Sequence, residues 1–184
     1  KTVAGARTEA QVLTLAGALE RQTEHPLADA IVSAARDRGL TLGSPTGFES
    51  HPGRGVVGVV DGVAVAVGNA RLMQEWSIDT SAMDDDVGPL MNEAKTVSYV
   101  ALDGALAGVV AIADPVRPTS RDAVASLGRM GLDVVLLTGD NERVAHAVAR
   151  NIGVEHVVAG VLPDGKVDEV MRLQAGRHVV RMVG

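Results

Sequence analysis

The chain has 184 residues, a formal net charge of −6 and no cysteine, so it can form one large or two small domains but no disulfide, thiolate zinc site or cysteine nucleophile. Only 2% of the residues are aromatic, which together with the acidic charge argues against nucleic-acid partners, because their binding modules use basic surfaces and stacking rings. No apolar run approaches the roughly 20 residues that span a membrane, and no signal peptide precedes the first helix. We expect an excised soluble piece.

The first half of the sequence predicts an α+β domain built around two β-hairpins. Alternating apolar residues flank two Asp-Gly turns, Asp61-Gly62 and Asp103-Gly104, which is a strong hairpin signal. Adjacent hairpins predict an antiparallel sheet with helices packed on one face. The helices are expected at residues 9–21, 26–38, 69–76 and 84–94, the first preceded by a capping-box spacing and the second opened by a proline.

The second half of the sequence alternates between helices and strands after a proline-punctuated joint at residues 114–118. Helices are predicted at residues 119–130, 142–150 and 164–174, and strands at residues 132–137, 156–159 and 178–183. This alternation is typical of βαβ units and predicts a parallel sheet. The chain therefore combines an α+β unit with part of a doubly wound α/β unit.

The turn Thr138-Gly139-Asp140 follows an apolar, β-branched run that reads as a buried parallel strand. A hydroxyl, a glycine and a helix N-terminus beyond the carboxyl end of a strand suit a phosphate group. Lys166 begins another predicted helix and would add an ammonium group. The alternative is an ordinary turn in which Asp140 or Asn141 caps the helix, with Lys166 on the surface, but the combination favours phosphoryl chemistry.

Two segments match the residue pattern of a nucleotide-binding motif but lack features that the motif requires. Gly53-Arg54-Gly55-Val56-Val57-Gly58 fits G-x-G-x-x-G, but that motif must open a helix and here the chain continues into a hairpin. Residues 160–166 resemble a Walker A loop, but Val167 replaces the magnesium-binding hydroxyl and Pro163 removes a backbone N–H. Gly53 and Gly55 therefore mark either a bulge or turn at a strand start, or a close approach of backbone amides to a nucleotide.

Glu20 and His25 could converge across the turn between the first two predicted helices. A histidine at a helix start is commonly a cap or a surface residue, but a neutral imidazole can also bond an adenine edge, and a carboxylate can accept from the exocyclic amine. The other four histidines lack metal-ligand spacing, so no protein-bound metal site is predicted.

Taken in order, these features resemble the cytosolic ATP-binding region of heavy-metal-transporting P-type ATPases, particularly the copper-exporter branch. The resemblance covers nearly the whole chain, and the His-Pro element is the hallmark of the metal-transporting branch. The residues that carry it are Glu20, Glu24-His25-Pro26-Leu27-Ala28, Gly53-Arg54-Gly55-Val56, Val67-Gly68-Asn69, Lys95-Thr96-Val97, Asp114-Pro115-Val116-Arg117-Pro118, Thr138-Gly139-Asp140-Asn141, Leu162-Pro163-Asp164-Gly165-Lys166 and Met182-Val183-Gly184.

The resemblance implies an α+β nucleotide-binding domain at residues 5–112, joined to a partial α/β phosphorylation domain of haloacid-dehalogenase (Rossmann-type) fold at residues 113–184. The implied cofactors are ATP and Mg²⁺. The positions implied to contact ATP on its adenine and ribose side are Glu20, His25, Gly53 and Gly55, with Asn69 counted among the nucleotide-binding residues. Thr138 and Lys166 are implied to hold the transferred phosphoryl group, and Asp140 to organise the magnesium-nucleotide end.

The sequence departs from the family pattern at the residues that form the phosphorylation site. The phosphorylated aspartate of the D-K-T-G-T motif, the first strand of the phosphorylation domain and the magnesium-binding aspartates after Met-Val-Gly are missing, and Arg181 stands where a small residue is expected. We therefore expect ATP binding without turnover. His25→Gln and Gly55→Asp are each expected to weaken ATP affinity without unfolding the chain.

The implied parent is an integral membrane pump that exports heavy-metal ions, with copper expected, through an aspartyl-phosphate intermediate. This piece would lie at the cytoplasmic face of the membrane, and its partners would be the remaining phosphorylation, actuator and transmembrane domains. Two alternatives remain open: a free-standing ATP-binding regulatory module, and a soluble phosphatase of the haloacid-dehalogenase type.

Overall fold

The computed structural model describes residues 1–2, 7–113, 116–161, 163–176 and 179–183. The chain divides into two compact units, Lys1–Asp114 and Pro115–Gly184. We refer to them as unit 1 and unit 2 and describe each by itself. Their assignment to a nucleotide-binding and a phosphorylation domain stays a prediction.

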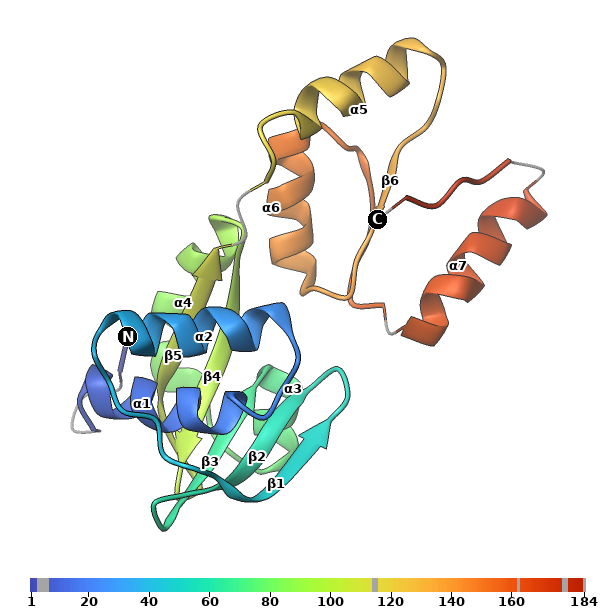
Figure 1. Ribbon diagram of the computed structural model, residues 1–184. Coiled ribbons are helices and arrows are strands. Elements are labelled where there is room, and N and C mark those ends of the chain that lie inside the picture. Colours follow the sequence, from blue (N-terminus) through green and yellow to red (C-terminus); the bar gives the residue numbers. More distant parts are fainter. Residues whose placement is uncertain (3–6, 114–115, 162, 177–178, 184) are drawn as a thin grey trace. The chain divides into compact units, whose positions relative to one another are not determined.

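Unit 1 is built on a five-stranded antiparallel sheet whose strands follow one another in chain order (Figure 1). The strands are β1 (Thr46–His51), β2 (Gly55–Val60), β3 (Val63–Gly68), β4 (Lys95–Leu102) and β5 (Ala105–Ala113). Both predicted hairpins are confirmed: Val60 pairs with Val63 across the first Asp-Gly turn, and Leu102 pairs with Ala105 across the second. The central residues Asp61 and Asp103 have φ of 50°, as turns of this type require.

Helices cover both faces of this sheet, so the expectation of helices on one face is wrong. The helices α1 (Glu9–Glu20) and α2 (Pro26–Asp37) lie on one face, and α3 (Ala70–Glu75), the 3₁₀ turn η1 (Ser81–Met83) and α4 (Asp84–Asn92) lie on the other (Figure 1). The reason is visible in β3, where Val65 and Val67 face one core and Ala66 faces the second. A strand that is apolar on both sides must be covered on both sides.

Unit 2 has the predicted βαβ order. Its elements are α5 (Ser120–Arg129), β6 (Val135–Leu137), α6 (Glu142–Ile152), β7 (His156–Val158) and α7 (Pro163–Ala175). The strands β6 and β7 are parallel, with Val135 opposite His156 and Leu137 opposite Val158. Together with unit 1, this confirms the predicted fold class, an α+β part joined to a partial α/β part.

The predicted last strand is not formed by residues 179–183, and residue 178 lies outside the described residues. Within the described part of the chain only β6 and β7 pair in unit 2, and the side chains of Val179 and Val183 are 103% and 83% exposed. A strand needs a neighbour to satisfy its backbone groups. The apolar pattern of this segment is therefore present without the pairing that would make it a strand.

Candidate functional site

Glu20 is the last residue of α1. Among the residues that the structure describes, it is the polar residue that is buried, with a relative exposure of 9%. It has no ion-pair partner among the residues that the structure describes. Burial raises the pKa of its carboxyl to about 7, since a low-dielectric surrounding disfavours the charged form. The nearby Thr23 hydroxyl lowers that pKa, an effect smaller than that of burial. Its oxygen is buried and meets no hydrogen-bond geometry.

His25 is the N-cap of α2, and Pro26 occupies the first helical position. Its Nδ1 accepts a hydrogen bond from the Leu27 backbone N–H at 3.2 Å. In a neutral ring the proton therefore sits on Nε2, which has no partner among the described residues and is a free donor. The capping alternative is realised, and it leaves the other ring nitrogen available for a ligand.

The turn between β1 and β2 contains Gly53, Arg54 and Gly55, and its backbone is fixed from the side by Asn69. The Asn69 side-chain amide donates to the Gly53 carbonyl at 2.9 Å, and the Asn69 backbone N–H donates to the Arg54 carbonyl at 2.8 Å. The side-chain oxygen of Asn69 accepts from two backbone N–H groups at the start of α3. Asn69 thus joins the turn to a helix end. Its contacts here are structural, and binding of a nucleotide remains a prediction.

Gly55 packs directly against the backbone of β3. Its φ is +149°, and a Cβ placed on it would lie 2.2 Å from the Val67 carbonyl oxygen and 2.5 Å from the Gly68 Cα. Reciprocally, a Cβ on Gly68 would lie 2.4 Å from the Arg54 carbonyl oxygen. Glycine is therefore required at residue 55 by chain packing. The expectation that Gly55→Asp leaves the fold intact conflicts with this geometry, since no side chain fits there.

Gly53 has a φ of +70°, which also favours glycine. The turn that it opens and the turn between α1 and α2 lie at the same end of unit 1 (Figure 1). Leu19, the residue before Glu20, approaches β2, because its Cδ1 lies 2.8 Å from the position of a Cβ on Gly58. The segments that contain Glu20, His25 and the glycine turn therefore belong to the same end of unit 1.

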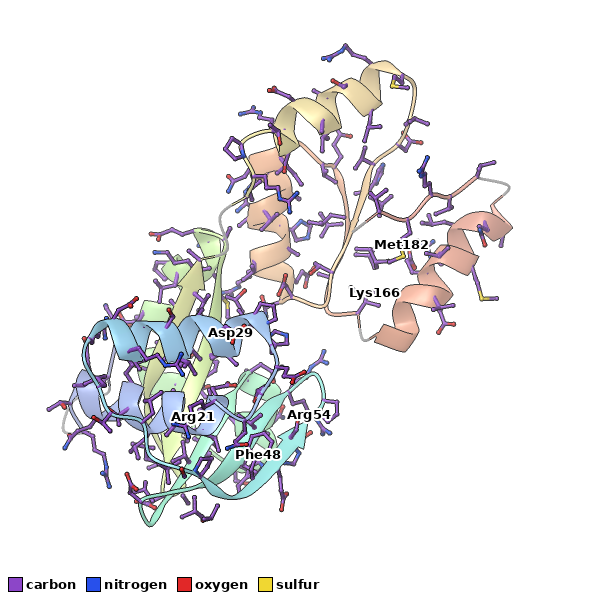
Figure 2. All side chains as sticks on the ribbon, viewed as in Figure 1. Arg21, Asp29, Phe48, Arg54, Lys166 and Met182 are labelled. Carbon is purple, nitrogen blue, oxygen red and sulfur yellow. The ribbon has the colours of Figure 1, made fainter. Side chains whose placement is uncertain are left out.

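A guanidinium also belongs to this end of unit 1. Arg54 Nη1 lies 2.5 Å from Glu75 Oε1 on α3, with the two side chains 40% and 43% exposed (Figure 2). Arg54 and Thr23 are not among the site residues predicted from the sequence. Arg54 lies between two predicted site glycines, and Thr23 lies two residues before His25. Only the buried, unsatisfied hydroxyl distinguishes Thr23 from a surface threonine, and no sequence pattern encodes it.

In unit 2, Thr138 and Asp140 bond to each other at the carboxyl end of β6. The Thr138 hydroxyl donates to Asp140 Oδ2 at 2.8 Å and accepts from the Asp140 backbone N–H at 3.1 Å. Asn141, and not Asp140, caps α6, through the Arg143 N–H at 2.9 Å. The Asp140 carboxylate is therefore exposed and free of a capping role, while the Thr138 hydroxyl must turn its proton away from Asp140 to reach a phosphate.

The loops after β6 and β7 are joined by backbone hydrogen bonds. The Val161 N–H donates to the Thr138 carbonyl at 3.1 Å, and the Gly160 N–H donates to the Asp140 carbonyl at 2.8 Å. This pairing brings the start of α7 to the same edge. Lys166, near that start, makes no hydrogen bond or ion pair with other described residues, and it lines an open, mainly apolar depression of about 380 Å³ with Val167, Val170 and Met182 (Figure 2).

The described residues contain no group of three or more histidine, aspartate or glutamate side chains arranged to hold a metal ion. Asp140 supplies one carboxylate, which matches the way Mg²⁺ is held by one or two carboxylates plus nucleotide phosphates. Within the same described residues, no helix combines the length and apolar character needed to cross a membrane.

Comparison with known proteins agrees with this architecture. The chain is 44% identical over 176 residues to the copper-transporting P-type ATPase of Rhizobium leguminosarum bv. viciae, a match that covers 96% of this chain and 21% of the relative. The chain thus spans about a fifth of the length of such curated relatives.

Two solved structures are similar to different extents of the chain. A zinc-transporting PIB-type ATPase in its E2.Pi state matches 95% of this chain and 28% of its own, with a TM-score of 0.61 and 31% identity. The N-domain of HMA8, a copper-transporting P-type ATPase, matches 61% of this chain and 95% of its own, with a TM-score of 0.51 and 30% identity.

Residues 2–184 match the family described as "haloacid dehalogenase-like hydrolase". The predicted resemblance to heavy-metal-transporting P-type ATPases is confirmed by relatives and solved structures of that kind. The chain belongs to the haloacid dehalogenase-like hydrolase family.

Proposed function

We propose that this chain is the cytosolic ATP-binding region of a P-type ATPase that exports heavy-metal ions, with unit 1 as the nucleotide-binding domain and unit 2 as part of the phosphorylation domain. The observation that carries the proposal is the arrangement at one end of unit 1. A buried carboxyl, a histidine with a free Nε2–H and a glycine turn held by Asn69 belong to segments at that end. The similar proteins named as copper- and zinc-transporting ATPases support the same assignment.

In this proposal the adenine side of ATP is held by Glu20 and His25, and Gly53 with Gly55 shapes the ribose side. Asn69 holds that turn in place through the Gly53 carbonyl. The free Nε2–H of His25 donates to a base nitrogen. This is compatible with the helix cap, because the cap uses only Nδ1. Asn69 therefore acts on the nucleotide through the turn.

On the phosphoryl side, Thr138 and Lys166 would hold the transferred group, and Asp140 would bind the Mg²⁺ that arrives with ATP. A hydroxyl and an ammonium group neutralise phosphoryl oxygens, while the metal ion supplies charge neutralisation across the phosphates. The sequence contains no D-K-T-G-T motif, so this chain holds no nucleophile of that kind. We expect it to bind ATP and release no phosphate.

The transported ion is proposed to be copper, because several relatives named as copper-transporting or copper-exporting are 42% to 45% identical to this chain, although a silver-exporting relative is 44% identical as well. The remaining phosphorylation, actuator and transmembrane domains of the pump are the proposed partners. The proposed location is the cytoplasmic face of the membrane that the pump crosses.

Calorimetric titration of ATP into the 184-residue chain tests the binding assignment. His25→Gln should weaken ATP affinity at least tenfold while the circular dichroism spectrum stays that of a folded chain. Thr8→Ala is the matched control, because Thr8 caps the opposite end of α1 through a capping box and its loss costs a comparable ~1 kcal/mol of stability. Unchanged affinity in folded His25→Gln would overturn the adenine role, and steady phosphate release by pure chain would overturn the absence of turnover.

A further inference from the structure

The Glu20 carboxyl is buried in surroundings that hold no compensating cation. Its helix packs against α2, β2, β3 and β5, and these three strands contain no titratable side chain. The charged residues of α2, namely Asp29, Arg36 and Asp37, are exposed, as are Glu24 and His25 in the preceding turn. The adjacent Arg21 is exposed and bonds the Leu42 carbonyl at 3.3 Å. Nothing on the elements around Glu20 neutralises a negative charge.

The polar groups at the end of α1 are incompletely satisfied by the described residues. The Thr23 hydroxyl oxygen is buried and meets no hydrogen-bond geometry, and the neighbouring Glu20 carboxyl has no ion-pair partner among the residues that the structure describes. Buried polar groups are nearly always satisfied, so an unsatisfied hydroxyl beside a buried carboxyl without a counter-charge points to a ligand that completes them. Burial holds the pKa of Glu20 near neutrality, so the acid form is readily available.

The protonation state of a carboxyl decides which base edge it fits. A carboxylate offers two acceptors, which match the two adjacent N–H donors of guanine. A neutral acid offers one acceptor and one donor, which match the exocyclic amine of adenine and the ring nitrogen beside it. The neutral form also avoids burying a charge when the base excludes water.

We propose that Glu20 binds the nucleotide as the neutral acid and reads adenine through two hydrogen bonds. Its carbonyl oxygen accepts from the exocyclic amine, and its hydroxyl donates to the neighbouring ring nitrogen. One proton is taken from solvent with each ATP bound whenever Glu20 was ionised beforehand. This inference rests on the proposed function of unit 1 and assigns a proton linkage to the same site.

The linkage has a definite sign. ATP affinity should be full well below pH 7 and should fall as the pH rises through 7, because only the protonated site is competent. A site that titrates at about 7 loses affinity about tenfold between pH 6 and pH 8. Binding through the carboxylate would give the opposite slope.

The test is calorimetric titration of ATP into the 184-residue chain in two buffers of different ionisation enthalpy. At pH 8 we expect an uptake of nearly one proton per ATP. Glu20→Gln is the matched variant, because its amide carries the same donor and acceptor as the neutral acid. Glu20→Gln should take up no proton through this group, and its affinity for ATP should not fall between pH 6 and pH 8 as that of the original chain does.

Comparison with Glu20→Gln also cancels the titration of the ATP phosphates, which is the same for both proteins. Proton release, no difference in proton uptake between the two proteins, or affinity that rises with pH would each overturn the neutral-acid proposal while leaving ATP binding standing. Absence of ATP binding at every pH would overturn the proposed function and this inference together. Circular dichroism at pH 6 verifies that Glu20→Gln is folded.

Discussion

The two units of this chain differ in how completely their apolar side chains are covered. Unit 1 has two buried clusters, one on each face of its sheet. In unit 2 the buried apolar residues among those described are Val144, Ala145, Ala147, Ala149 and Val154, all in α6 or just after it. Its strands β6 and β7 are at most half-buried, and α5 has no buried residue.

This difference in packing indicates which unit can hold a rigid binding site. A rigid binding site needs side chains held by packing on several sides, and the Glu20 end of unit 1 has that support. The segments after β6 and β7 are joined mainly by three backbone hydrogen bonds between residues 138–140 and 158–161. Apolar side chains of unit 2 such as Met130 and Met171 are exposed. We infer that unit 1 is preorganised for the nucleotide and that unit 2 is the less stable of the two.

The largest loss of stability in unit 1 is expected from Gly55→Ala. Its Cβ would lie 2.2 Å from a backbone oxygen, so overpacking together with strain should destabilise unit 1 by about 4 kcal/mol. Gly62→Ala is the control, because Gly62 has a φ of +78° but open space around it, for which about 1 to 2 kcal/mol is expected. Chemical denaturation measures both, and similar losses for the two variants would contradict the packing role of Gly55.

A leucine truncated in each unit compares the two cores directly. Leu72 is fully buried, so Leu72→Ala should reduce the stability of unit 1 by about 3 kcal/mol. Leu136 is only half-buried in β6, so Leu136→Ala should reduce that of unit 2 by about half as much. Amide hydrogen exchange measures the stability of each unit separately. A loss of stability from Leu136→Ala that equals or exceeds that from Leu72→Ala would contradict the inferred difference in packing between the two units.

The burial of Glu20 predicts a pH-dependent stability that unit 1 should show. The pKa of this group is raised from 4.5 to about 7 in the folded chain, so the folded state holds a proton that the unfolded state has lost. Its stabilising contribution is full below about pH 4.5 and is lost as the pH rises to about 7, a change of at most about 3 kcal/mol. The difference in unfolding free energy between the original chain and Glu20→Gln should therefore shift by that amount across this range. A difference that stays constant would show that the carboxyl is not buried in solution.

The smallest effect is expected from the ion pair of Arg54 and Glu75. Both side chains are about 40% exposed, and exposed pairs contribute about 0.5 kcal/mol or less. Arg54→Gln, Glu75→Gln and the double variant form a cycle that isolates the pair. A coupling energy well above 1 kcal/mol would show that this ion pair, more than Asn69, fixes the glycine turn.

Much of the fold follows from local patterns in the sequence. The hairpins at Asp61-Gly62 and Asp103-Gly104 were predictable because turn chemistry and alternation agree there. Coverage of both sheet faces was missed, although β3 is apolar on both sides, because hairpin topology alone does not say where helices pack. The final strand was predicted from the same alternation that predicted the hairpins, but its pairing depends on a neighbour that no local pattern supplies.

The candidate site was less predictable than the fold. His25 and the two glycines could be selected from their motifs, but the close approach of Gly55 to β3 depends on packing at atomic scale. The altered pKa of Glu20 and the unsatisfied Thr23 hydroxyl likewise arise from burial by residues distant in sequence. Local sequence therefore indicates which residues to inspect, and tertiary packing decides their chemical state.

Amide hydrogen exchange of the 184-residue chain with and without Mg²⁺-ATP tests the central claim most directly, because it reports on both units in one experiment. If unit 1 holds the nucleotide, exchange slows most at residues 20–25 and 51–55, and any slowing at residues 138–140 and 159–161 is smaller. Slower exchange confined to the loops of unit 2, or no change in unit 1 at saturating ATP, would contradict the account.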